Sequence, residues 1–186
     1  MRKAVALVIM IVVCSIYFIA MNDAENGQQG DTSTSTLVEV PDTKDERLIV
    51  IEDIIEEIEK EYPPTPKFLM ETNNTIMVLQ YDQGVTPEVI EETVKALEML
   101  YSEEALSRNT YSSQLEWIEE IRANKEADVY LVGSTIDSIT FPTPEKAFVE
   151  VTHEMTKKMQ KRQYTLIKQD GLWKIDSYKE LAESER

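Results

Sequence analysis

Residues 164–175 read Tyr-Thr-Leu-Ile-Lys-Gln-Asp-Gly-Leu-Trp-Lys-Ile, two runs of strand-forming residues separated by Asp170-Gly171. Both positions of a two-residue hairpin turn need positive φ, which Asp and Gly tolerate. The stretch therefore predicts two antiparallel strands, near Gln163–Gln169 and Leu172–Tyr178.

The same two-residue period extends backward to about Ala127. Apolar or β-branched residues occur around Val129, Leu131, Ile136 and Phe141. One strand face is then predicted to carry Ala147, Val149, Val151, His153 and Met155, and the other Phe148, Glu150, Thr152 and Glu154. This part of the chain predicts an antiparallel meander.

Helical spacing precedes the strands. Ile51, Ile54, Ile55 and Ile58 predict an amphipathic helix over Leu48–Tyr62, although residues 48–51 are equally good strand material. Two further helices are predicted to start at cap-plus-proline signals, Thr65-Pro66 and Thr86-Pro87, and a third to cover Tyr111–Asn124. Their predicted inward residues include Val89, Ile90, Val94, Leu97, Leu100, Leu115, Ile118 and Ile121.

The first residues combine two cations with an apolar run. Arg2 and Lys3 precede an uninterrupted apolar stretch over residues 4–20, which is long enough to span the hydrocarbon layer with the cations on the cytoplasmic side. The sites at Ala20 and Ala24 lack a small residue two positions earlier, which favours an uncleaved signal anchor over a removed signal peptide. The sequence thus predicts a single-pass cell-membrane protein with a cytoplasmic N-terminus and an extracytoplasmic C-terminal domain.

Composition divides the rest of the chain. We predict a signal anchor over residues 1–21, a flexible acidic tether over 22–46, and a connecting helix or strand over 47–62. An α+β domain over 63–180 and a tail over 181–186 follow. The single cysteine, Cys14, lies inside the apolar run, so the domain has no disulfide.

The formal net charge is −16, which repels phosphate backbones and argues against a nucleic-acid partner. No metal-ligand spacing and no cofactor motif stands out, so we expect neither a metal nor a cofactor.

The closing hairpin, together with the order of helices and then strands, resembles the end of NTF2-like (cystatin-like) domains. The break at Tyr62-Pro63-Pro64-Thr65-Pro66 behind an anchored tether resembles an uncharacterised family of extracytoplasmic proteins from Gram-positive bacteria. The resemblance implies a cone in which helices pack on a curved antiparallel sheet. It transfers no functional residues, because the fold serves isomerases, dehydratases, scaffolds and binding modules alike.

Two groups of residues are candidates for a site. His153 is the only histidine, and as a general base it would need a carboxyl partner such as Asp128 or Asp137; its alternative role is structural. Tyr130, Phe148, Tyr164 and Trp173 form either an aromatic ligand pocket or part of the core.

A basic cluster is expected in a loop before the hairpin, either solvated or docked on an acidic partner. It consists of Lys157, Lys158, Lys161 and Arg162.

The preferred functional interpretation is a membrane-tethered binding or interaction module without catalytic activity, with a protein, cell-wall component or small molecule as ligand. A small-molecule isomerase or dehydratase on the same cone is one alternative. A scaffold subunit of an envelope secretion or conjugation complex, self-associating as a homo-oligomer, is another.

Overall fold

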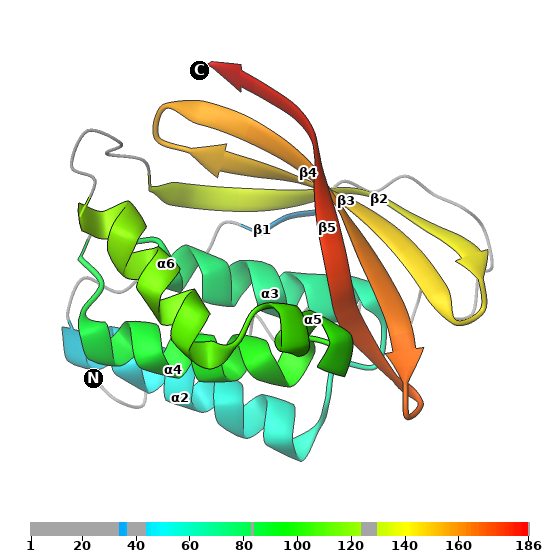
Figure 1. Cartoon of the computed structure of the whole chain (residues 1–186), viewed down its shortest axis with the longest axis horizontal. Coiled ribbons are helices and arrows are strands. Elements are labelled where there is room, and N and C mark those ends of the chain that lie inside the picture. The colour runs from blue at the N-terminus through cyan, green and yellow to red at the C-terminus, as the bar shows by residue number, and fades with distance from the viewer. Residues whose placement is uncertain (1–33, 37–43, 83, 124–129, 186) are drawn as a thin grey trace. The chain divides into compact units, whose positions relative to one another are not determined.

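The computed structural model describes residues 34–36, 44–82, 84–123 and 130–185. The chain divides between Thr32 and Ser33, and all described residues belong to the second unit. Helices precede the long strands (Figure 1). The elements are β1 (Thr34–Thr36), α2 (Lys44–Lys60), α3 (Pro66–Gln80), α4 (Pro87–Leu100), α5 (Glu103–Arg108), α6 (Tyr111–Ala123), β2 (Leu131–Thr143), β3 (Lys146–Met155), β4 (Lys158–Gln169) and β5 (Leu172–Glu185).

Both predicted cap-plus-proline starts are confirmed. The Thr65 side chain accepts a hydrogen bond from the backbone N–H of Phe68 at 3.3 Å, and Thr86 accepts one from Val89 at 3.5 Å. Each cap is followed by a proline at the first helical position, where a missing N–H costs nothing. In α2, residues 48–51 are helical, which decides between the two interpretations of that segment.

The sheet is an antiparallel meander in which spatial order follows chain order, β1-β2-β3-β4-β5. The β4–β5 turn has Asp170 at φ 53° and Gly171 at φ 81°, as the Asp-Gly pair predicts. β4 begins at Lys158, so Lys158, Lys161 and Arg162 belong to a strand and their prediction as loop residues is wrong. β1 and the start of α2 fall within the predicted tether, and the end of β5 within the predicted tail.

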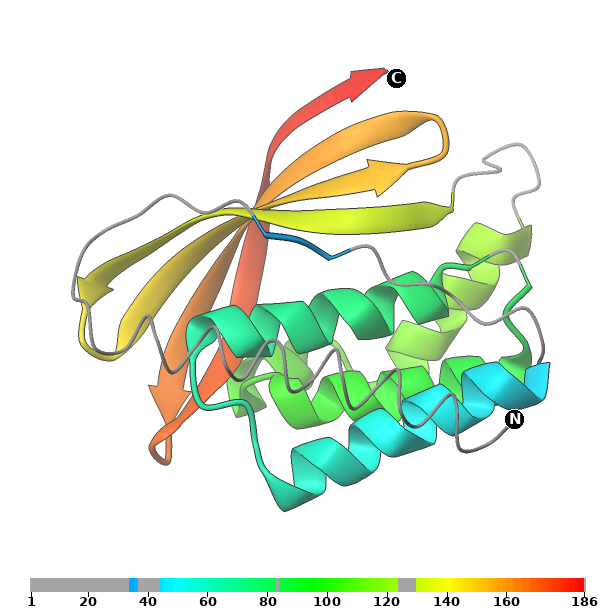
Figure 2. The same ribbon diagram turned by 180° about the vertical axis from the view of Figure 1, so that it is seen from behind.

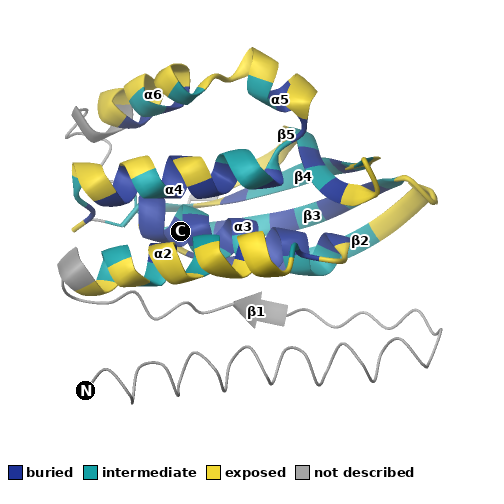
Figure 3. Cartoon of the chain, turned by 90° about the horizontal axis from the view of Figure 1, so that it is seen from below, coloured by how far each residue is buried: buried dark blue, intermediate teal, exposed yellow. Residues whose placement is uncertain are grey.

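The helices lie on one side of the sheet, with α3 next to the strands and α2 and α4 packed beyond it (Figures 1 and 2). The core between these layers is fully closed: Ile76 of α3, Leu166 of β4 and Ile175 of β5 are each 0% exposed. Figure 3 shows the buried faces of the helices turned toward one another and toward the sheet.

This packing corrects the predicted NTF2-like cone. As a general base, His153 would need that cone to be open at the sheet face that carries Val149, Val151 and His153. All three side chains are 0% exposed, because helix and core side chains fill the space against that face. The NTF2-like assignment is therefore wrong, and the described strands leave no opening to solvent at His153.

The membrane prediction is corrected as well. None of the described helices has the combination of length and apolar character that crossing a bilayer requires. The longest of them, α2, has the sequence KDERLIVIEDIIEEIEK, with charges throughout. The predicted anchor, including the membrane contact over 4–20 and Cys14, lies outside the described residues. The described residues thus give the single-pass prediction, with its extracytoplasmic domain, no support.

Candidate functional site

His153 is sealed between the sheet and α3. Its Nδ1 lies 2.8 Å from Ser134 Oγ on β2, and its Nε2 lies 2.8 Å from the Tyr164 hydroxyl on β4. The Tyr164 hydroxyl also donates to Met77 Sδ of α3 at 3.9 Å. A neutral ring protonated at Nε2 satisfies this series, with Ser134 donating to Nδ1 and Nε2–H donating to Tyr164.

Burial determines the protonation state of this histidine. Desolvation, with a smaller contribution from the charge of Arg162, lowers the pKa of His153 to about 3. The ring is therefore neutral at physiological pH, and it is 0% exposed. These properties suit a hydrogen-bonded core histidine.

The structure does not bring the predicted carboxyl partners to His153. Asp137 lies on the opposite sheet face, where its Oδ2 accepts a hydrogen bond from Thr152 Oγ1 at 2.7 Å and pairs with Lys161 Nζ at 3.3 Å. Asp128 lies outside the described residues.

The four predicted aromatic residues do not share a pocket. Tyr164 and Trp173 are core residues, 1% and 7% exposed. Phe148 is half-buried beneath Lys146 Nζ, on the sheet face opposite Ala147 and Val149. Tyr130 is half-buried beside Thr156, where the two residues exchange hydrogen bonds before β2 begins.

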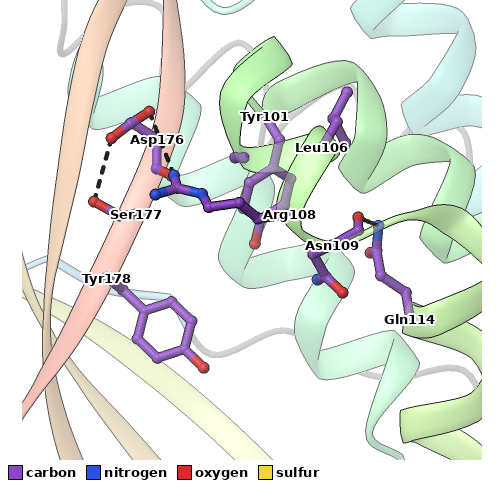
Figure 4. A pocket seen from close by; sticks show the side chains of 9 residues that line it. Tyr101, Leu106, Arg108, Asn109, Gln114, Asp176, Ser177 and Tyr178 are labelled. Atoms are coloured by element: carbon purple, nitrogen blue, oxygen red, sulfur yellow. Dashed lines mark hydrogen bonds and ion pairs between the residues drawn. The ribbon is translucent and has the colours of Figure 1, made fainter.

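A cavity of about 210 Å³ opens elsewhere, between α5, the start of α6 and strand β5 (Figure 4). We call it the β5 recess. It is lined by Tyr101, Ala105, Leu106, Arg108, Asn109, Gln114, Asp176, Ser177 and Tyr178.

The connection between α4 and α5 holds this recess in place. Tyr101 ends α4 in an extended conformation and forms a parallel bridge with Ile175 of β5. The next residue, Ser102, donates its backbone N–H to the Ile175 carbonyl at 2.9 Å. The Ser102 hydroxyl accepts from the Ala105 N–H at 3.1 Å, which caps α5, and donates to Asp176 Oδ1 at 3.0 Å.

Arg108 attaches the C-terminal end of α5 to β5. Its Nη2 donates to the Asp176 carbonyl at 2.9 Å and lies 3.7 Å from Asp176 Oδ1. Gln114 of α6 donates to the Asn109 carbonyl at 3.1 Å, which joins the two helices at the rim. The polar groups of the rim are thus largely engaged within the protein.

The inner wall of the recess is aromatic and aliphatic. Tyr101 and Tyr178 supply the rings, and Ala105 and Leu106 supply aliphatic surface. Burial raises the pKa of the Tyr101 phenol, and the neighbouring Tyr164, Tyr81 and Tyr178 raise it further. The Tyr101 phenol therefore remains neutral, and the apolar wall is surrounded by phenol and amide groups and by the paired Arg108 and Asp176.

The sequence analysis missed this site. Tyr178 appeared only as the end of a predicted strand, and Tyr101 was not singled out. A signal was present at Ser102-Glu103-Glu104, where a capping hydroxyl precedes two acids that suit a helix N-terminus. It predicts α5 but gives no contact with β5, which follows only from the folded structure.

Metal ligands are not grouped in this region. Among the described residues, no three His, Cys, Asp or Glu side chains come together in a way that would hold an ion.

Comparison with proteins of known structure and function adds little about chemistry. No curated protein matches the sequence. A similar solved structure is the solution structure of a SEC-C motif containing protein from Rhodopseudomonas palustris, with 9% identity and a TM-score of 0.48, covering 70% of this chain and 91% of that one. So distant a likeness carries no argument about fold or function.

A family model matches far more of the sequence. The model described as Domain of unknown function (DUF6715) covers residues 1–178, from the predicted anchor to the last wall residue of the recess. The chain therefore belongs to the DUF6715 family.

Proposed function

We propose that this protein is a binding module without catalytic activity, whose small-molecule ligand places an apolar group in the β5 recess. The observation that carries the proposal is the recess itself: a cavity of about 210 Å³ with an inner wall of Tyr101, Ala105, Leu106 and Tyr178. An apolar cavity of about 150 Å³ accepts benzene. The recess thus has room for one ring or a short branched chain.

The polar groups at the recess support binding more than catalysis. A general base must reach the proton that it removes. The recess carboxylate, Asp176, is instead engaged by Ser102, Arg108 and the Ser177 hydroxyl, which donates to Oδ2 at 3.3 Å. The only histidine is closed inside the core and is not among the recess residues.

The rim would orient the ligand. Asn109, Gln114 and Ser177 place amide and hydroxyl groups around an apolar interior, the usual composition of a small-molecule pocket. Tyr178 is 49% exposed, so its ring can move to admit a ligand without disturbing the core.

The test uses para-fluorobenzamide, a neutral single-ring probe, in a fluorine NMR titration of the full chain. We expect saturable binding. Ala105→Met should weaken it about tenfold or more, because the longer side chain fills space that the ring needs. Ala182→Met is the matched control, since Ala182 is exposed on β5 and does not line the recess.

Two outcomes would overturn the proposal. One is the absence of saturable binding to the wild-type chain. The other is equal affinity in Ala105→Met and wild type, which would place the probe elsewhere. Thermal unfolding of both variants checks that the fold is kept.

A further inference from the structure

Arg162 is an incompletely compensated cation on the helix-facing side of the sheet. Its side chain is 12% exposed, and its Nη2 lies 3.8 Å from Glu180 Oε1. Arg47, at a similar 11% exposure, pairs with Asp82 at 2.6 Å. The Nε of each arginine is buried without a hydrogen-bond partner, so Arg162 differs from Arg47 in the longer distance to its carboxylate. A desolvated guanidinium normally has its N–H groups and its charge matched more fully than this.

Glu180 compensates this charge only weakly. Its side chain is 56% exposed, and the same Oε1 accepts a hydrogen bond from Gln160 Nε2 at 2.7 Å. Gln160 also has a buried Oε1 without a partner. Gln160 and Arg162 are neighbouring inward-facing residues of β4. Each thus has one buried polar atom without a hydrogen-bond partner.

Aromatic rings form the remaining surroundings of Arg162. Its guanidinium carbon lies 4.6 Å from the centre of the Tyr178 ring, and the Tyr178 and Tyr164 rings are 5.7 Å apart. Burial raises the pKa of the Tyr81 and Tyr101 phenols, and the charge of Arg162 acts on both in the opposite direction. The Tyr164 side chain also hydrogen-bonds with Arg162, but none of these neutral rings supplies a counter-charge.

The same rings connect Arg162 to the β5 recess. Tyr178 and Tyr101 both line the recess, one from β5 and one from the end of α4 (Figure 4). Tyr178 packs on the guanidinium with its half-exposed ring. A ligand whose ring fills the recess therefore lies next to the Tyr178 side chain, which also contacts Arg162.

We infer that the ligand of the β5 recess carries a carboxylate that pairs with Arg162, while its aromatic or aliphatic body occupies the recess. This inference rests on the function proposed above. A carboxylate has the planar, two-oxygen geometry that a guanidinium binds through two N–H groups. The net charge of −16 repels anions at a distance, so the preference arises from contact within the site.

The first test compares two probes of nearly equal shape on the wild-type chain. We expect para-fluorobenzoate to bind about tenfold or more tightly than para-fluorobenzamide, as a charge-assisted hydrogen bond predicts. The Arg162 Nε–H resonance should shift on addition of the benzoate and stay in place on addition of the amide. This readout needs no substitution and so does not depend on the stability of a variant.

The second test removes the cation. Arg162→Met should abolish the preference for benzoate and leave amide affinity within about twofold, because the recess itself is kept. Lys161→Met is the matched control: it removes the same charge one position away, where Lys161 pairs with Asp137 and Glu150 on the opposite sheet face. That variant should keep the full preference.

The outcomes distinguish ligand binding in the β5 recess from carboxylate pairing with Arg162. Equal binding of benzoate and amide, or an unchanged preference in Arg162→Met, overturns the carboxylate inference and leaves the recess function standing. Failure of both probes to bind overturns the recess function and the inference with it. Benzoate binding that Ala105→Met does not weaken shows an anion site without the recess, and also overturns the inference as stated.

Discussion

At the scale of single residues, the clearest feature is a histidine that the fold uses as a neutral hydrogen-bonding group. His153 joins Ser134 and Tyr164 across three strands and is closed to solvent. Such a series fixes the strands laterally, because each polar atom would be unsatisfied if its neighbour moved. The strength of this arrangement depends on the ring remaining uncharged.

The first prediction concerns pH. The folded pKa of His153 is about 3 and the ordinary value is 6.5, so the unfolded chain binds a proton that the folded chain does not. Stability is therefore full above the ordinary pKa and falls as pH drops toward the folded value. We expect the free energy of unfolding to fall by about 1 kcal/mol per pH unit between about pH 6 and 5.

Urea unfolding of wild type and His153→Gln at several pH values measures this effect. The glutamine amide donates and accepts hydrogen bonds without titrating, so its profile should lack the histidine contribution. Carboxylates titrate in both proteins and cancel in the difference. Parallel profiles would contradict the neutral, buried assignment.

For single residues, the sequence predicted the buried face of a strand correctly, because this needs only the alternation of side chains along the strand. His153 was placed on the face of Val149 and Val151, and all three are buried. Its partners were not foreseeable, since Ser134 is 19 residues away and register shifts interrupt the β2–β3 pairing. Arg162 was expected in a loop, either solvated or docked on an acidic partner, whereas the alternation of Tyr164 continues through Arg162 to Gln160.

At the scale of elements, α5 matters most, because this short helix forms one wall of the recess. Six residues form too few turns to be stable on their own. Ser102 and Arg108 hold the two ends of the helix to β5, at Ile175 and Asp176. The recess should therefore depend on these contacts.

The second prediction removes the contact at the N-terminus of α5. Ser102→Ala loses both the helix cap and the hydrogen bond to Asp176, and should lower the free energy of unfolding by about 1–2 kcal/mol. It should also weaken probe binding, because α5 loses its attachment. Ser107→Ala is the control on the same helix, since Ser107 is exposed and donates only to the Glu104 carbonyl.

Chemical denaturation and fluorine NMR together decide this point. A stability loss in Ser102→Ala no larger than that of Ser107→Ala would show that the cap contributes nothing specific. Unchanged probe affinity in a clearly destabilised Ser102→Ala would separate α5 from the recess and contradict its role as a wall.

Elements with strong local signals could be predicted, and those fixed by distant contacts could not. The starts at Thr65 and Thr86 and the Asp170-Gly171 turn need only neighbouring residues, and all three are present. Helix α5 has no hydrophobic period and owes its position to β5. The continuation of β5 to Glu185 likewise depends on pairing with β4, as far as Lys158.

At the scale of the whole molecule, the described domain places its closed core and its opening in different regions. The helix-facing side of the sheet is filled against α3, whereas the recess lies at the β5 edge beside α5 and α6. Only the enzyme interpretation of the expected cone needed an open cavity at His153. Sequence patterns gave the inward face correctly but could not show that helix side chains fill it.

This separation is the central claim: ligands contact the β5 recess and do not reach His153. The most direct measurement is a set of intermolecular nuclear Overhauser effects between bound para-fluorobenzamide and the isotopically labelled full chain. The account predicts contacts from the probe ring to the Ala105 methyl group and the Tyr178 ring, and none to the His153 ring. Contacts to His153, or their absence at Ala105 and Tyr178 in a saturated complex, would contradict it.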